Sequence, residues 1–134
     1  MKPFINMPLV YVAGSFRGKT PWVVEQNIRK AEHKALEIAY FNAIPVCPHT
    51  MYRFFDKQRD DQFWLNATIG ILNKCHGAYF LERWEESEGA RLEMEFAGNW
   101  EKPVFSDMRD LREWINNWYE NKARKVSNKG QTEQ

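Results

Sequence analysis

Short apolar runs alternate with longer segments of helical periodicity along most of this chain, and no other feature of the sequence constrains its fold as strongly. The apolar runs fall at residues 9–13, 44–46, 78–81 and 103–105 and are rich in β-branched and aromatic residues, as strands are. Strands separated by helices form right-handed βαβ units, and such units build a parallel sheet covered on both faces. The alternation therefore predicts an α/β fold.

The segments between these runs place apolar residues three and four positions apart, which is typical of helices packed along one face. Helices are expected at residues 21–42, 60–74 and 88–99, and Asp107 is placed to cap a last helix. The residues expected on the buried face of that last helix are Leu111, Trp114, Ile115 and Trp118. Residues 48–52 are expected to form a loop.

These elements predict one Rossmann-like (flavodoxin-like) domain over residues 1–121, with a sheet of four or five parallel strands. Pro45 favours an edge position for the second strand, because proline cannot donate a hydrogen bond to a neighbour. Residues 122–134 form a polar tail that we expect to be disordered.

Composition excludes several classes of function. The 134 residues suit one domain, and 19 basic side chains balance 18 acidic ones, so nothing indicates a nucleic-acid partner. No apolar run approaches the ~20 residues that span a bilayer, and the first residues lack the apolar region of a signal peptide. We expect a cytoplasmic protein without a membrane partner.

Two cysteines are too few for a disulfide framework. Together with their neighbours they suggest a zinc ligand set of Cys47, His49, Cys75 and His76. The first pair follows one parallel strand and the second precedes another, so the two pairs belong to opposite edges of the sheet. We therefore expect no metal site.

Ligands of open parallel sheets bind beyond the carboxyl ends of the strands, and the loops expected there carry unusual residues. The first loop offers glycines, a hydroxyl and a guanidinium suited to phosphate, in the run Gly14, Ser15, Phe16, Arg17 and Gly18. A plain turn is the alternative explanation of its glycines. After the third strand, Ser87 and Gly89 begin a helix whose free amides favour an anion. Ser87 is alternatively a simple N-cap.

Glu93 is unusual because its helical neighbours form a small or apolar face, made by Ala90, Phe96, Ala97 and Trp100. A carboxylate on such a face is buried at a cost in free energy, which is typical of functional acids. Glu95 lies on the solvated side of the same helix and is expected to be a surface charge. A buried acid paired for structural reasons is the alternative for Glu93.

A carboxylate near an anion site could act on the sugar of a nucleotide. As a nucleophile it would attack the anomeric carbon and form a glycosyl-enzyme, the two-step chemistry of retaining glycosidases. Departure of the base usually needs a general acid, so a second ionisable group is expected. This chemistry requires no cofactor.

With these motifs, the chain resembles the nucleoside 2-deoxyribosyltransferase superfamily, and most closely its 2'-deoxynucleoside 5'-phosphate N-hydrolases. The similarity covers residues 10–105 and includes the glycine loop, His49, the run 60–63 and the pattern Ser87-x-Gly89-x-x-x-Glu93. It implies that Glu93 is the nucleophile, that Ser87 and Gly89 hold a 5'-phosphate helped by Ser15 and Arg17, and that His49 lies near the base. It also implies a homodimer or larger homo-oligomer whose neighbouring subunit completes the site.

The sequence departs from this pattern at Thr68, where the family has its general-acid aspartate. A hydroxyl cannot replace that acid at neutral pH, although Thr68 lies on the face expected to point toward the sheet. Asp61 lies two helical turns away, roughly 10 Å along the axis, and His76 lies at the other end of the helix. Neither is well placed to substitute for the aspartate.

Aromatic residues near the expected ligand edge could stack on a base, and Trp84 is a better candidate than Trp22. Three functions remain open. The chain is either an enzyme acting on the N-glycosidic bond of a nucleoside or its 5'-monophosphate, or a module that binds a nucleotide without turning it over. An interaction subunit that uses only the surface of the fold is a third possibility.

Overall fold

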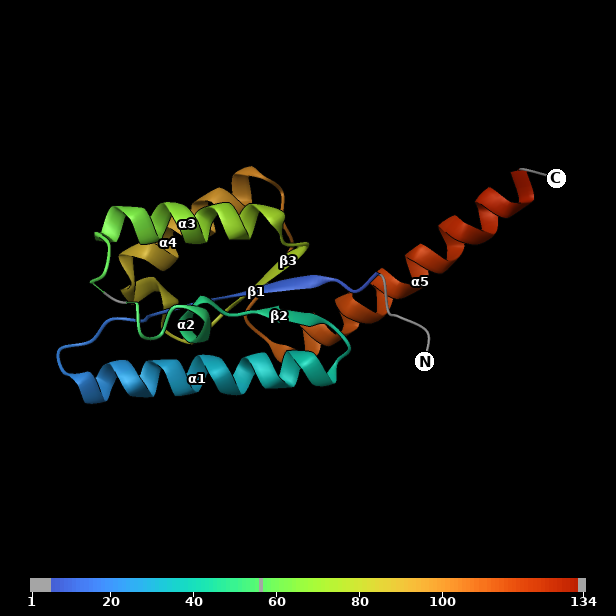
Figure 1. The fold of residues 1–134 in the computed structure, drawn as a ribbon. Coiled ribbons are helices and arrows are strands. Elements are labelled where there is room, and N and C mark those ends of the chain that lie inside the picture. The colour runs from blue at the N-terminus through green and yellow to red at the C-terminus, as the bar shows by residue number, and fades with distance from the viewer. Residues whose placement is uncertain (1–5, 56, 133–134) are drawn as a thin grey trace.

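Four parallel strands form a sheet at the centre of the fold (Figure 1). The computed structural model describes residues 6–55 and 57–132 and, beyond residue 127, the backbone alone. The strands are β1 (Leu9–Ala13), β2 (Ile44–Val46), β3 (Gly77–Phe80) and β4 (Val104–Phe105). Their order in the sheet is β2-β1-β3-β4. The predicted α/β fold is confirmed, and β2, which contains Pro45, is an edge strand as expected.

The long helices begin where the sequence supplies a capping side chain. They are α1 (Pro21–Tyr40), α3 (Asp61–Lys74), α4 (Glu88–Asn99) and α5 (Met108–Thr132). Thr20, Asp60 and Ser87 each accept a hydrogen bond from the backbone N–H three residues ahead, which satisfies a donor that the helix leaves free. Asp107 accepts from the N–H groups of Arg109 and Asp110 and caps α5 as predicted.

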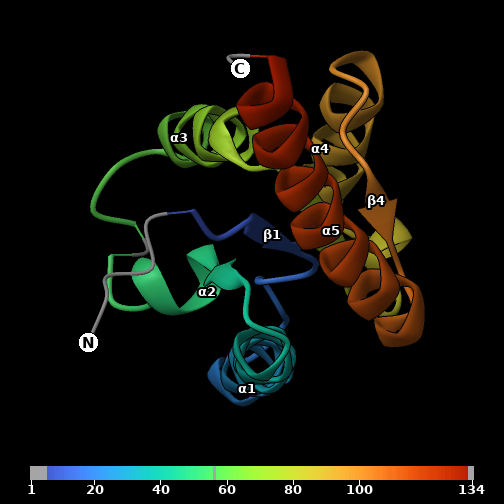
Figure 2. The same ribbon diagram turned by 90° about the vertical axis from the view of Figure 1, so that its right-hand side faces the viewer.

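Two apolar cores lie on opposite faces of the sheet, because side chains alternate along each strand. On β1, Val10 and Val12 face α1 and the first half of α5, where Leu111 and Ile115 are fully buried. Tyr11 and Ala13 face the other way, toward α3 and α4 (Figure 2). Trp114 and Trp118, predicted to be buried with Leu111 and Ile115, are only partly buried.

The structure differs from the sequence-based expectation in three local features. Residues expected to form a loop make a one-turn helix, α2 (Pro48–Met51), which is too short to leave a periodic signal. The first helix ends at Tyr40, two residues early, where Asn42 takes a positive φ of 66°. The last helix continues to Thr132 through the segment expected to be disordered, and it projects away from the sheet (Figure 1).

This continuation has a local explanation, because residues 120–126 are mostly good helix formers and contain no glycine or proline. The end of the predicted tail, residues 133–134, lies outside the described part of the chain. No helix among the described residues is both long and apolar enough to cross a membrane.

Candidate functional site

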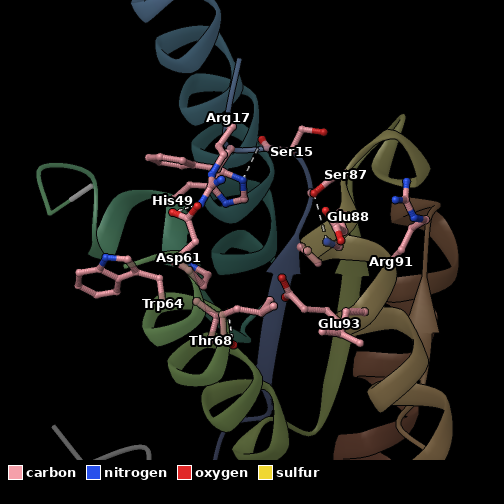
Figure 3. Close-up of a pocket in the computed structure, with 18 of the residues that line it drawn as sticks. Ser15, Arg17, His49, Asp61, Trp64, Thr68, Ser87, Glu88, Arg91 and Glu93 are labelled. Carbon is pink, nitrogen blue, oxygen red and sulfur yellow. Dashed lines mark hydrogen bonds and ion pairs between the residues drawn. The ribbon is translucent and has the colours of Figure 1, made fainter. Parts of the chain in front are cut away.

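A cavity of about 760 Å³ opens at the carboxyl edge of the sheet, between α3 and α4 (Figure 3). This volume suits a small-molecule ligand. The floor is the end of β1, and the walls come from the loop after β1, from α2, from α3 and from the start of α4. The sequence-predicted residues that line the cavity are Gly14, Ser15, Phe16, Arg17, His49, Thr68, Ser87, Gly89 and Glu93. The topology therefore brings together residues that are up to 79 positions apart (Gly14 to Glu93) in the chain.

Glu93 extends from α4 into this cavity (Figure 3) and is 8% exposed. Burial raises the pKa of its carboxyl from 4.5 to about 7, because loss of water penalises the charged form, while a hydrogen bond with Tyr11 lowers it. Its Oε2 atom is buried without a hydrogen-bond partner in the described residues. Glu93 has no salt-bridge partner among the described side chains, which disfavours the alternative of a structurally paired acid.

Tyr11 lies on the cavity floor next to Glu93, and sequence reasoning missed it. Burial raises the pKa of its hydroxyl well above 10, and the neighbouring Glu93 raises it further. The hydroxyl therefore stays protonated at neutral pH and can donate a hydrogen bond to the carboxylate. A signal was present, since a tyrosine in a fully buried strand carries a polar atom that needs a partner.

Thr68 faces Glu93 from α3, as its apolar helical face predicts (Figure 3). Its hydroxyl also lies near that of Tyr11. Its hydroxyl donates to the carbonyl oxygen of Leu65 at 3.1 Å. Asp61 lies at the mouth of the cavity in an exposed ion pair with Arg17. His76 does not line the cavity. It lies at the amino edge of the sheet, where its Nδ1 accepts a hydrogen bond from the backbone N–H of Leu9.

His49 is held in α2 and is 5% exposed. Its Nε2 lies 3.1 Å from the carbonyl oxygen of Ser15, and because a carbonyl only accepts, Nε2 must carry the hydrogen. Burial lowers the pKa of the imidazole, so the ring is neutral at pH 7 and its Nδ1 is an acceptor. That Nδ1 is buried without a partner among the described residues. A neutral imidazole in this tautomer can accept from a ligand but cannot protonate it from Nδ1.

The loop after β1 forms one side of the cavity. A side chain at Gly14 would place its Cβ 2.6 Å from Leu81, which directly follows β3, so only glycine fits between the loop and Leu81. Phe16 packs against the His49 ring at 5.9 Å between centroids. Arg17, predicted to help with a phosphate, is instead bound to Asp61.

Ser87 and Gly89 lie where predicted, at the start of α4 beside the cavity. Ser87 Oγ accepts from the backbone N–H of Ala90 at 3.1 Å, so its capping role is confirmed. A Cβ at Gly89 would lie 3.7 Å from Leu65, which is an ordinary van der Waals contact. Packing therefore does not require glycine here, although the missing side chain leaves space in the cavity.

Three residues proposed from the sequence do not line the cavity. Trp84 packs edge-on against Phe80, 5.3 Å between centroids, in the core beneath α4. Trp22 is 69% exposed on the first turn of α1. Gly18 lies against Val23, which a Cβ would meet at 2.3 Å, and thus serves the turn into α1.

An aromatic group on the α3 side of the cavity was also missed. Trp64 lines the cavity and packs against Tyr52, Phe55 and Phe63, and its indole N–H is buried without a partner among the described residues. The described side chains contain three such unsatisfied buried polar atoms, on Trp64, His49 and Glu93, and all three residues line this cavity. Buried polar atoms usually have partners, so these three atoms remain able to form hydrogen bonds with a molecule in the cavity.

The four residues considered as zinc ligands are separated by the sheet. Cys47 lies in the core beneath α1 and Cys75 in the core beneath α3 and α4, and both are free thiols. In the part of the chain that the structure describes, no group of three His, Cys, Asp or Glu side chains is arranged to hold a metal ion.

Fold and site together define an α/β domain with a ligand-sized cavity at the carboxyl edge of a parallel sheet. The chain belongs to the family of a domain of unknown function, DUF7768, whose model matches residues 8–107. The matched segment contains all four strands and every residue named above as lining the cavity. No curated protein matches the chain.

Proposed function

We propose that this protein binds a nucleoside or nucleoside 5'-monophosphate and cleaves or transfers its N-glycosidic bond, with Glu93 as the nucleophile. The observation that carries the proposal is the buried Glu93 carboxyl, which has no ion-pair partner among the described side chains and whose Oε2 atom lacks a hydrogen-bond partner there. Its pKa of about 7 leaves a large ionised fraction at neutral pH. The resemblance of residues 10–105 to nucleoside 2-deoxyribosyltransferases supports the same role.

In the first step, a carboxylate oxygen of Glu93 attacks the anomeric carbon of the sugar. A bond forms between this carbon and the oxygen, and the bond to the base nitrogen breaks with its electron pair going to the base. The Tyr11 hydroxyl orients the carboxylate through its hydrogen bond. In the second step, water or another base attacks the same carbon and releases Glu93.

The departing base must gain a proton, and the site offers no well-placed acid for it. Thr68 occupies the position of the expected acid, His49 is neutral, and Asp61 is bound to Arg17. Loss of a base without a general acid is slower by a factor of about 10²–10⁴. This favours a second candidate function, in which the same cavity captures a nucleoside or nucleotide without turning it over.

The two candidates are separated by incubating the protein with a panel of 2'-deoxynucleosides and their 5'-monophosphates and measuring free base by chromatography. The enzyme releases base, and Glu93→Gln abolishes the release while retaining the fold. Glu113→Gln, an exposed position on α5, is the matched control and releases base at the wild-type rate. Saturable binding with no release after long incubation supports the binding module. No binding of any nucleoside or nucleotide contradicts both.

The proposal includes a cytoplasmic homodimer or larger homo-oligomer, as the resemblance implies. An exposed apolar surface lies next to the cavity at the end of α2 and on the segment that follows it, where Met51, Phe54 and Phe55 are 46%, 83% and 51% exposed. An exposed aromatic patch of this kind often marks a protein interface. Sedimentation at several protein concentrations tests this homo-oligomeric state, and a monomer at every concentration contradicts it.

A further inference from the structure

Carboxylates surround the amino end of α4, where a 5'-phosphate would be expected to bind. Glu86 and Glu88 flank Ser87, and both line the cavity from exposed positions. Glu88 lies in the first turn of α4, so its charge already interacts with the positive end of the helix dipole. A phosphate at the same amides would meet two like charges within one residue of Ser87.

Cations that could offset these charges are engaged elsewhere. Among the described residues that line the cavity, the cationic side chains are Arg17 and Arg91. Arg17 is paired with Asp61 on the opposite wall. Arg91 donates to the carbonyl oxygen of Glu85 at 2.6 Å and points away from the space between Glu93 and Thr68 (Figure 3). His49 adds no charge because its imidazole is neutral.

A hydroxyl group suits this environment better than a phosphate. It can donate to a carboxylate and accept from a backbone N–H at the same time, whereas a phosphate oxygen only accepts. Ser87 precedes Glu93 by six residues, which is roughly 9 Å along the helix, so a sugar whose anomeric carbon meets Glu93 extends its 5' end toward Ser87. The unpartnered buried atoms of Glu93 and His49 independently indicate a polar ligand in this cavity.

We infer that the sugar bound here carries a free 5'-hydroxyl, so that the ligands are uncharged nucleosides and not nucleoside 5'-monophosphates. This inference rests on the proposed function and narrows it. It also departs from the branch that the sequence resembles most closely, in which the 5'-phosphate is part of the substrate.

Binding to Glu93→Gln protein, in which turnover is prevented, tests the inference by calorimetry. The ligands are the four common 2'-deoxynucleosides and their 5'-monophosphates at low ionic strength. The nucleosides bind at least tenfold more tightly than their monophosphates. Adding Glu88→Gln reduces this preference at least threefold, because the monophosphates then bind more tightly. Raising the salt concentration also reduces the preference, because screening weakens the repulsion between the phosphate and the carboxylates. Adding Glu113→Gln leaves the preference unchanged.

Equal or tighter binding of the monophosphates overturns the inference and leaves the proposed function standing. No binding of either ligand class overturns the proposed function, and the inference falls with it. A nucleoside preference that Glu88→Gln does not change contradicts the role of these carboxylates.

Discussion

In the proposed reaction Glu93 must be ionised to attack the sugar, so its protonation should control the reaction rate. Burial raises the pKa of its carboxyl to about 7, and below that pH the protonated form is not a nucleophile. We expect kcat/KM for base release to fall about tenfold for each pH unit well below 7 and to level off above about pH 8. A rate profile measured between about pH 5 and 9 tests this. A flat profile over that range contradicts the role of Glu93.

The same pKa predicts an effect on stability. In the unfolded chain the Glu93 carboxyl has its ordinary pKa near 4.5, so between 4.5 and about 7 the folded state binds more protons and loses stability as pH rises. A shift of this size corresponds to about 3 kcal/mol above pH 7. Glu93→Gln should therefore stabilise the fold by about 1–3 kcal/mol at pH 8 and by much less at pH 4.5.

Urea unfolding at both pH values measures this difference in the free energy of unfolding. Glu95→Gln, on the exposed side of α4, is the matched control and should change stability by less than about 0.5 kcal/mol at either pH. A Glu93→Gln protein that is less stable than wild type at pH 8 would mean that the carboxylate has a favourable partner.

Thr68 provides a second test at the residue scale. Thr68→Asp places a carboxyl group facing Glu93, where an acid could protonate the departing base. We expect base release to increase at least tenfold, because a well-positioned general acid contributes a factor of about 10²–10⁴. The rate profile should also shift to higher pH, because a second carboxylate raises the pKa of Glu93. Thr68→Asn has the same shape without the acid and should give no increase. Equal rates for the Asp and Asn variants would contradict this assignment.

At the scale of elements, the glycine within α3 and the glycine directly after β1 have opposite roles. Gly70 lies within α3 at a solvent-exposed position, and a Cβ there would meet nothing within 4 Å. Gly70→Ala should stabilise the fold by about 0.5–1 kcal/mol, because alanine loses less backbone entropy in a helix. Gly14→Ala should destabilise it by about 1–3 kcal/mol, since its Cβ would lie 2.6 Å from Leu81. Thermal unfolding of both variants tests the pair, and destabilisation by Gly70→Ala would contradict it.

The elements themselves were largely predictable from the sequence. β1, β2 and α4 have the predicted bounds, and the other strands and helices differ at their ends by one or two residues, apart from α5. Their patterns are long or strongly apolar, and capping residues such as Ser87 mark where the helices begin. α2 was missed because one turn has no periodicity. The length of α5 was missed because its second half is helical without burying an apolar face.

At the scale of the whole molecule, the sheet topology explains why the candidate site was partly predictable. The parallel order places the loops after β1, β2 and β3 at one edge, which brings Gly14, His49 and Ser87 together as expected. Partners of individual side chains were not predictable, because they depend on packing between elements. Arg17 pairs with Asp61 on α3, Trp84 packs in the core, and Tyr11 on the cavity floor contacts Glu93 of α4.

The projecting part of α5 should contribute little to the stability of the whole domain. Residues 123–127 are exposed, whereas Leu111 and Ile115 at the start of the helix are fully buried. Ending the chain after Lys122 should change the free energy of unfolding by less than about 0.5 kcal/mol. Leu111→Ala should cost about 2–5 kcal/mol in the same urea titration. A truncated chain as unstable as the Leu111→Ala variant would contradict this division of α5.

The central claim is that Glu93 forms a covalent bond with the sugar of a nucleoside. The most direct measurement is the intact mass of the protein after acid quenching during incubation with 2'-deoxynucleosides, followed by peptide mapping. We expect a mass increase of one deoxyribosyl group on the peptide containing Glu93, present in Thr68→Asp protein as well and absent from Glu93→Gln. Base release without any adduct, or an adduct that persists in Glu93→Gln, would contradict it.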